Sequence, residues 1–600
     1  MRFHLQQLYC SGDSLVKFPS VRFAALPSPN LFPVSKSWAN QMSIRTFRIS
    51  SVAVVLFGVI LNWFTGHRGL FLNDQSIVWD GGWRILQGQV PYRDFWMPLG
   101  PVPFVIQAAF FALLGVNWSA TVASACFLNA IVTASVIRSV RLLVPDELKV
   151  FALLAGLSMA ALFQTVFGTL WLEQTAFFFG FLAVWAVMEA SARRKPASWL
   201  FLMLAGVFLA LSILSKQNAG ILMTILAFGL VIVQSLPRLR QILASLAACA
   251  AGLGLAAASF ALWLFAFSDP SRFVAAWKGA AEIGASRVTG ATLLKILLLH
   301  PSGMSSELAG LACLAVGGVA IVVGFSDSPR RGPLFSLAPL GYLCAGSVLV
   351  QSAFQATTLN ERQNVLFFSC YALALAAAAF AWLVRNLVVR TSADSNTSPA
   401  FPPRRAVRLA GVGTLLALYL GIALLGLDAS WTRVVQQFPP GSTFAHLASD
   451  PTLRGLRLGS PDLVSLTDHV QLRTQDFEAV VHYLRGQQGD FFVFGDSTLL
   501  YGMLHRPSPQ PLLYFQQKHS YFPGDIPAVD RAVVDALQKN HVSIVVNETS
   551  RWQPHPDPIQ SFPLLWSWMQ RDFHVVARFG VYEVWEKNKA SVAAAEGGKP

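Results

Sequence analysis

Long apolar runs separated by short polar connections fill the first two thirds of the chain. A helix needs about 20 mostly apolar residues to span the hydrocarbon core of a bilayer. Runs of this kind occupy residues 49–66, 119–142, 149–168, 172–190, 197–215, 219–236, 241–267, 307–325, 333–353, 364–386 and 406–427. The pattern predicts a polytopic α-helical membrane protein with about 11 transmembrane helices.

One further apolar segment, residues 98–116, carries Pro98, Pro101 and Pro103 at its start. Proline removes backbone donors that lipid cannot replace. If this segment does not cross and the N-terminus is cytoplasmic, the basic clusters between later runs lie inside, as the positive-inside rule requires. We therefore predict a juxtamembrane or re-entrant helix that returns to the outer face; the alternative is an ordinary crossing with a weak charge bias.

The pattern changes after Asp428 to that of a water-soluble domain. Helical spacing at 474–485 and 528–538, short strand-forming runs at 491–494 and 542–546, and a hairpin around Gly580 predict a small α/β domain. The expected organisation is a disordered cytoplasmic leader (1–45), a transmembrane domain (46–428) with outer loop 67–97, an extracytoplasmic α/β domain (429–588) and a disordered tail (589–600). Met42 is an alternative start.

Composition supports membrane insertion, because 54% of the residues are hydrophobic and only 13% are charged, against about 25% in soluble proteins. The net charge of +14 comes from short basic clusters between apolar runs, which are typical of topology determinants and argue against nucleic-acid binding. Five of the six cysteines lie in apolar runs, with no CxxC or HExxH spacing, which argues against disulfides and structural zinc. We expect a bacterial inner-membrane protein with its N-terminus inside and its C-terminal domain outside.

The first outer loop places Asp74, Asp80 and Asp94 among arginines and tryptophans. In the predicted topology, Glu173 and Lys216 at helix ends and Arg362 in a later turn lie on the same face. Charges at the membrane are costly and therefore candidate functional groups, although long side chains also snorkel to the headgroups. Asp80 and Asp94 have a second interpretation, in which they pair with Arg84 and Arg93 to fold the loop.

The loop also resembles the first outer loop of the GT-C glycosyltransferases, in the residues Asn73-Asp74-Gln75, Gly88, Pro91-Tyr92-Arg93-Asp94-Phe95, Pro98 and Pro101. The resemblance, to enzymes such as protein O-mannosyltransferases and the lipid A aminoarabinose transferase, implies a GT-C-like fold and sugar transfer from a polyprenyl-phosphate carrier. It implies that Asp74 is the catalytic base and that Glu173 is the family's second acid. Gln75 stands where the family often has an acid beside this Asp.

Such a transfer needs a base for the acceptor hydroxyl and cations for the departing phosphate. Partial desolvation near the lipid headgroups should raise the basicity of Asp74. Lys216 would hold the phosphate as a point charge, and Arg362 or Arg93 as a bidentate fork. Direct displacement of this kind inverts the anomeric centre. The sequence leaves open whether a divalent metal assists, and whether the acceptor is a lipid, a glycan or a protein.

Two other classes of protein share the apolar pattern. A transporter or lipid flippase would place ionisable residues near the bilayer midplane and show internal repeats, whereas the charges of this chain lie at helix ends. A scaffold that presents the C-terminal domain would leave Asp74 replaceable. The charge placement favours the enzyme.

Overall fold

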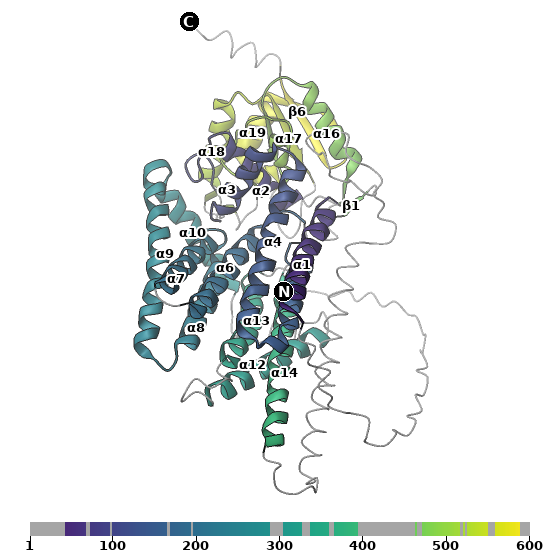
Figure 1. Cartoon of the computed structure of the whole chain (residues 1–600). Helices are drawn as coiled ribbons and strands as arrows, with labels where there is room; N and C mark the ends of the chain where they lie inside the picture. The colour runs from purple at the N-terminus through teal and green to yellow at the C-terminus, as the bar shows by residue number, and fades with distance from the viewer. Residues whose placement is uncertain are drawn as a thin grey trace, which may run out of the picture. The chain divides into compact units, whose positions relative to one another are not determined.

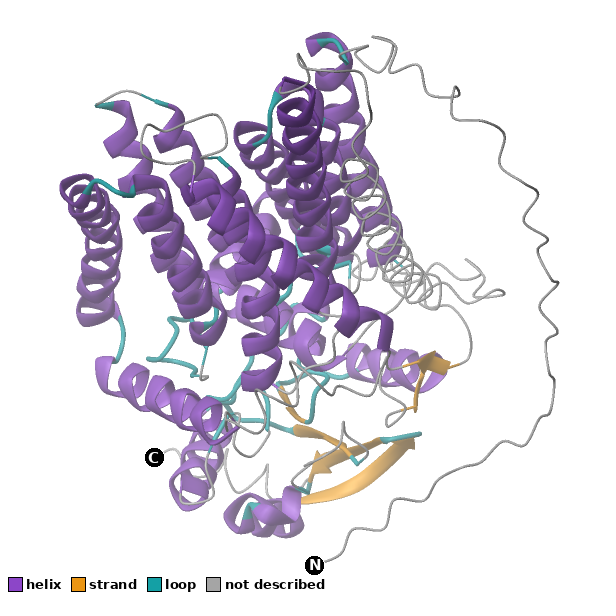
Figure 2. Cartoon of the chain, turned by 90° about the horizontal axis from the view of Figure 1, so that it is seen from below, coloured by secondary structure: helices purple, strands orange, loops and turns teal. Residues whose placement is uncertain are grey.

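The computed structural model shows a bundle of helices followed in sequence by a small sheet with its own helices (Figures 1 and 2). It describes residues 42–67, 72–96, 99–164, 168–193, 196–287, 304–326, 336–358, 365–393, 462–464, 471–515, 520–521, 525–549 and 558–588. Both parts belong to one compact unit, Ile44–Pro600. The predicted boundary at residue 428, most of the leader and all of the tail lie outside the described residues, so the predicted domain limits stay predictions.

Most helices of the bundle match the predicted apolar runs, whereas those at Leu72–Leu86 and Pro270–Arg287 lie between the runs. Its helices are α1 (Ile44–Gly66), α2 (Leu72–Leu86), α3 (Val102–Leu114), α4 (Trp118–Leu143), α5 (Val150–Leu162), α6 (Leu172–Ala192), α7 (Ala197–Ile213), α8 (Gln217–Ser235), α9 (Leu239–Phe267), α10 (Pro270–Arg287), α12 (Met304–Ser326), α13 (Leu337–Thr358) and α14 (Leu366–Ala393). In the described part of the chain, seven helices are long and apolar enough to cross a membrane. The chain is an integral multi-pass membrane protein. The expected run at 406–427 lies outside the described residues.

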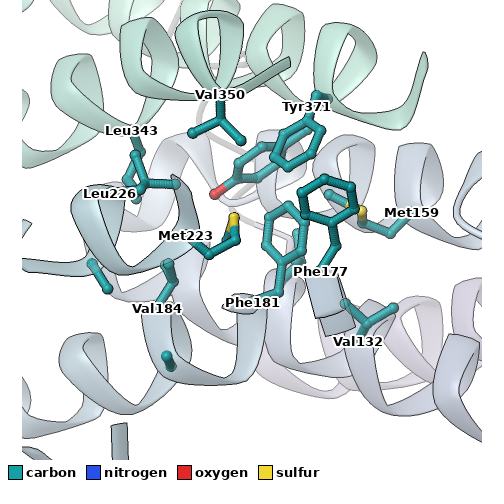
Figure 3. Close-up of a cluster of buried hydrophobic side chains, with 14 of the residues drawn as sticks. Val132, Met159, Phe177, Phe181, Val184, Met223, Leu226, Leu343, Val350 and Tyr371 are labelled. Atoms are coloured by element: carbon teal, nitrogen blue, oxygen red, sulfur yellow. The ribbon is translucent and has the colours of Figure 1, made fainter. Parts of the chain in front are cut away.

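Packing separates an aromatic interior from an apolar outer surface. Phe177, Phe181, Met223 and Tyr371, which come from α6, α8 and α14, point toward one another in the core (Figure 3). On α9, by contrast, Leu262 and Phe265 are about three quarters exposed. A helix with an exposed apolar face is stable in lipid but costly in water.

The proline-rich segment forms a short helix after which the chain returns to the same end of the bundle; that this end is the outer one stays a prediction. α3 has 13 residues, a length of about 20 Å at 1.5 Å per residue, which is short of the roughly 30 Å hydrocarbon core. The indole Nε1 of Trp118, the first residue of α4, donates to the carbonyl of Gly66, the last residue of α1, at 2.7 Å. The chain therefore returns to the end of the bundle at which it left.

The C-terminal part is the predicted α/β domain. Its four-stranded sheet has the order β3 (Phe491–Phe494), β4 (Ile544–Glu548), β6 (Tyr582–Lys587), β5 (Phe573–Phe579), with β3 and β4 parallel and the other pairs antiparallel. Four helices accompany it: α16 (Thr474–Gly486), α17 (Leu499–Met503), α18 (Ile526–Lys539) and α19 (Pro563–Asp572). A separate pair, β1 (Asp462–Val464) and β2 (Gln471–Arg473), precedes them.

The α/β domain packs on α2, and the two share a hydrophobic core. Trp79 and Trp83 of α2 lie in one buried cluster with Leu499 and Leu500 of α17. The contact is tight, because a Cβ added to Gly502 would lie 2.4 Å from the Trp79 indole nitrogen. The packing fixes the domain against the first loop, beside α2 and α3 (Figure 1).

Candidate functional site

The site is built where the first loop meets the ends of α1 and α6. Gly66 and Gly168 approach so closely that a Cβ on Gly66 would lie 2.3 Å from the Gly168 carbonyl oxygen. Gln75 in the first turn of α2 donates from Nε2 to the Thr169 hydroxyl at 2.8 Å. The start of α2 therefore lies against the segment that leads into α6.

Asp74 belongs to this first turn of α2, directly before Gln75. Its side chain lies outside the described residues, so its role as base stays a prediction. The contact of Gln75 with Thr169 places the backbone of position 74 near the segment that carries Glu173, four residues after Thr169. Gln75 itself is 2% exposed. Its side-chain amide joins the first turn of α2 to the segment before α6 through this hydrogen bond.

Glu173 and Lys216 form an ion pair at the same end of the bundle. Glu173 lies in the first turn of α6 and is 1% exposed, whereas Lys216 is the residue before α8 and its side chain is 16% exposed. The Lys216 ammonium also lies 5.7 Å from the centre of the Phe354 ring. Two helix N-termini thus meet at a buried acid that is paired with a partly accessible cation, and the N-terminus of α6 favours the ionised carboxylate.

The second half of the first loop reaches the turn that carries Lys216. Gly100 lies so close to this turn that a Cβ would lie 1.6 Å from the Leu214 carbonyl oxygen. The Tyr92 hydroxyl donates to the carbonyl of Leu99, which fixes the preceding bend. The first loop therefore lies against the turn that leads into Lys216.

Arg93 and Asp94 lie in a tight bend of this loop that begins at Tyr92, which has φ 65°. Their side chains pair at 2.8 Å, and Asp94 also accepts from the Val90 amide at 2.7 Å. Partial burial opposes ionisation of Asp94, but hydrogen bonds from Arg93 and the Val90 amide outweigh it and lower its pKa. Arg272 of α10 donates to the Arg93 carbonyl at 2.9 Å. The pairing interpretation is confirmed for these two residues, and a ligand contact stays a prediction.

Asp80 and Arg84 also pair, at 2.8 Å, and both side chains are almost completely buried. The second carboxylate oxygen of Asp80 accepts from the Ser508 hydroxyl at 2.6 Å. Burial raises the pKa of Asp80, and Arg84 and the hydrogen bond from Ser508 oppose this shift. Both oxygens of Asp80 face protein, so the geometry favours a structural role over a substrate contact.

Arg362 lies outside the described residues, so its assignment stays a prediction. The end of α13 is held by Arg287, which donates to the carbonyls of Thr357 and Thr358 at 3.4 and 3.0 Å. Asn218 Nδ2 of α8 donates to the Thr357 hydroxyl at 2.8 Å. From the sequence, Arg287 lies in a long loop at residues 268–306 whose ionisable residues are expected to converge on this face, but it is given no specific role.

The opposite end of the bundle carries a different charge cluster. Glu189 in the last turn of α6 pairs with Arg138 of α4 at 2.6 Å and with Arg193. These basic residues lie at the far end of α6 from Glu173, as the positive-inside assignment expects. Within the ranges that the structure describes, no group of three or more His, Cys, Asp and Glu residues could hold a metal ion. The side chain of Asp74 lies outside these ranges.

Comparisons with known proteins returned structures alone. No family model and no curated protein sequence matches the chain. Among solved structures, ArnT from Cupriavidus metallidurans in its apo state matches with 14% sequence identity. The match covers 90% of this chain and 98% of that chain, with a TM-score of 0.47. The same protein bound to undecaprenyl phosphate also matches with 14% identity. That match covers 91% of this chain and 99% of that chain, with a TM-score of 0.47. The arabinofuranosyltransferase AftD from Mycobacteria has 14% sequence identity to this chain. The match covers 91% of this chain and 41% of that chain, with a TM-score of 0.42. At these TM-scores the likeness assigns no function or substrate.

Proposed function

We propose that this protein is a GT-C-type membrane glycosyltransferase that transfers a sugar from a polyprenyl-phosphate donor to an acceptor hydroxyl on the outer face, with inversion. The observation that carries the proposal is the pairing of Glu173 with Lys216 beside the start of α2. This cluster lies at the end of an apolar bundle, where the headgroup of a lipid carrier would enter. The loop resemblance supplies the reaction class.

The proposed roles follow from charge and position. Asp74 removes the proton of the acceptor hydroxyl as that oxygen attacks the anomeric carbon, and the bond from this carbon to the carrier phosphate breaks. Lys216 stabilises the charge that develops on the departing phosphate. Glu173 neutralises Lys216 when no phosphate is bound and fixes the ammonium in place. Arg93 and Arg362 are further candidate cations for the headgroup.

Charge placement also separates this proposal from a transporter or flippase. In the described helices that can cross a membrane, charged residues such as Arg48, Arg138, Glu173, Glu189 and Arg240 lie near a helix end. A transport pathway usually has ionisable residues near the bilayer midplane. The structure supports a site at the membrane surface.

The proposal is tested by mass spectrometry of envelope lipids, glycans and exported proteins from cells with and without the gene. A transferase predicts that one sugar disappears from one class of acceptor and returns when the gene is restored. If every acceptor keeps its sugars while a lipid or solute accumulates on one side of the membrane, the transporter alternative is correct.

A further inference from the structure

We infer that Asp80 and Arg84 are positioning residues that let the C-terminal α/β domain hold α2, and with it the base at position 74, in its working place. The inference builds on the proposed function, because it concerns how that site is kept in order. It also gives the C-terminal domain a part in the reaction, although this domain carries none of the proposed catalytic groups.

The junction between α2 and the domain is polar and buried. Asp80 and Arg84 lie one turn apart on α2, with side-chain exposures of 0% and 1%. Asp80 accepts from Ser508, and Arg84 donates from Nη1 to the Gln510 carbonyl at 2.7 Å and from Nη2 toward the Leu512 carbonyl at 3.5 Å. One ion pair of α2 thus contacts three residues of a single domain segment.

The same segment is tied back to the domain core. The Gln510 side chain accepts from the Tyr501 hydroxyl at 2.7 Å, and this hydroxyl accepts from the Val493 amide of β3 at 2.7 Å. A continuous set of hydrogen bonds therefore runs from the central sheet to Arg84. Buried hydrogen bonds such as these resist displacement, because each lost partner leaves an unsatisfied group.

α2 is suited to transmit this constraint to its first turn. Gly81 and Gly82 let α3 approach closely, since a Cβ on either would lie within 2.7 Å of Phe104 or Gln107. Asp80 follows Asp74 by six positions, which is about 9 Å along a helix. At the far end Gln75 is bonded to Thr169. The helix is thus held at both ends, by the domain and by the segment leading to Glu173.

Removal of one constraint should affect turnover more than binding. A displacement of about 1 Å at a reacting group can cost about 100-fold in rate, whereas Lys216 and the apolar bundle would still bind the lipid carrier. Asp80→Asn leaves Arg84 without its charged partner, and Ser508→Ala removes a single hydrogen bond. A matched control is Asp530→Asn, because Asp530 is equally buried and accepts two hydrogen bonds, from the Leu564 and Leu565 amides, inside the domain.

The test uses full-length protein in membrane vesicles, with total polyprenyl lipid extract from the source cells as donor and mass spectrometry of product. Rates are divided by the amount of monodisperse protein recovered from the same vesicles. For Asp80→Asn we expect the maximal rate to fall about tenfold or more, with the half-saturating amount of extract unchanged within about twofold. Ser508→Ala should show a smaller fall of the same kind, and Asp530→Asn should keep the wild-type rate per folded molecule.

Hydrogen exchange gives a readout that needs no substrate. Amides of residues 72–79 should exchange about tenfold faster in Asp80→Asn than in the wild type, and at the wild-type rate in Asp530→Asn. Wild-type rates and exchange in both Asp80→Asn and Ser508→Ala would overturn the inference, as would an equal fall in rate for Asp530→Asn. Full activity of Asp74→Asn would instead remove the proposed base and leave the exchange result standing.

Discussion

At the scale of single residues, the chain places a buried acid and a cation where two helices begin. Glu173 and Lys216 are 43 positions apart, yet they pair at the end of the bundle. Their positions near helix ends marked each of them as a candidate from the sequence. Their pairing could not be predicted, because it depends on how α6 packs against α7 and α8.

Lys216 is expected to act on the departing phosphate. Lys216→Met should lower the rate of sugar transfer by about 100-fold, since removal of one group that stabilises a developing oxyanion has that effect. The control is Lys278→Met on α10, whose side chain is 77% exposed, and it should keep the wild-type rate. Both rates are measured in vesicles with the same lipid extract. Equal rates in the two variants would exclude Lys216 from the reaction.

Asp94 gives a prediction about pH. Because its pKa is lowered in the folded loop, its pairing with Arg93 stabilises the loop above about pH 4, and this stabilisation is lost only as the pH falls further. A fall in rate on acidification between about pH 8 and 5 must therefore come from another group, which we expect to be Asp74. Asp94→Asn should keep this acidic limb in a pH series. Its disappearance in that variant would assign the limb to Asp94.

At the scale of elements, α2 was not expected as a helix within loop 67–97. The pair Gly81 and Gly82 lowers intrinsic helix propensity, and this local signal hid the helix. The structure explains the pair by the close approach of Phe104 and Gln107 from α3. Tertiary packing therefore decides this element, whereas the long apolar runs and the hairpin around Gly580 could be predicted from local pattern alone.

Gly100 tests the contact between the first loop and the α7–α8 turn. Gly100→Ala cannot be accommodated beside the Leu214 carbonyl without a backbone shift, and overpacking of this kind costs about 1 to 3 kcal/mol in free energy of unfolding. Gly254→Ala on α9 is the control, because nothing lies within 4 Å of the added Cβ. Thermal unfolding in detergent should show a lower midpoint for Gly100→Ala alone. A wild-type midpoint for this variant would mean that the loop is not held against the turn.

At the scale of the whole molecule, the topology decides on which side of the membrane the proposed site lies. The sequence predicted that segment 98–116 returns to its own side, because proline placement and loop charge agreed on it. The packing of the α/β domain on α2 could not be predicted, since the contacts join residues more than 400 positions apart. Which end of the bundle faces outward stays a prediction.

Cysteine labelling in intact cells tests this orientation. Starting from Cys10→Ser, a cysteine at exposed Lys278 on α10 should react with a membrane-impermeant maleimide added outside. A cysteine at Glu147, at the other end of the bundle, should react only after permeabilisation. The described native cysteines are buried, so background labelling should be low. The reverse pattern would place the proposed site inside the cell.

We propose that a carboxylate at position 74 removes the acceptor proton at the outer end of the bundle. The most direct test of this proposal is the transfer rate of Asp74→Asn, an isosteric change that keeps size and removes the base, in protein whose insertion and elution volume match the wild type. We expect the rate of sugar transfer to fall by about 100-fold or more, while the carrier lipid still binds. Transfer at the wild-type rate would exclude Asp74 as the base.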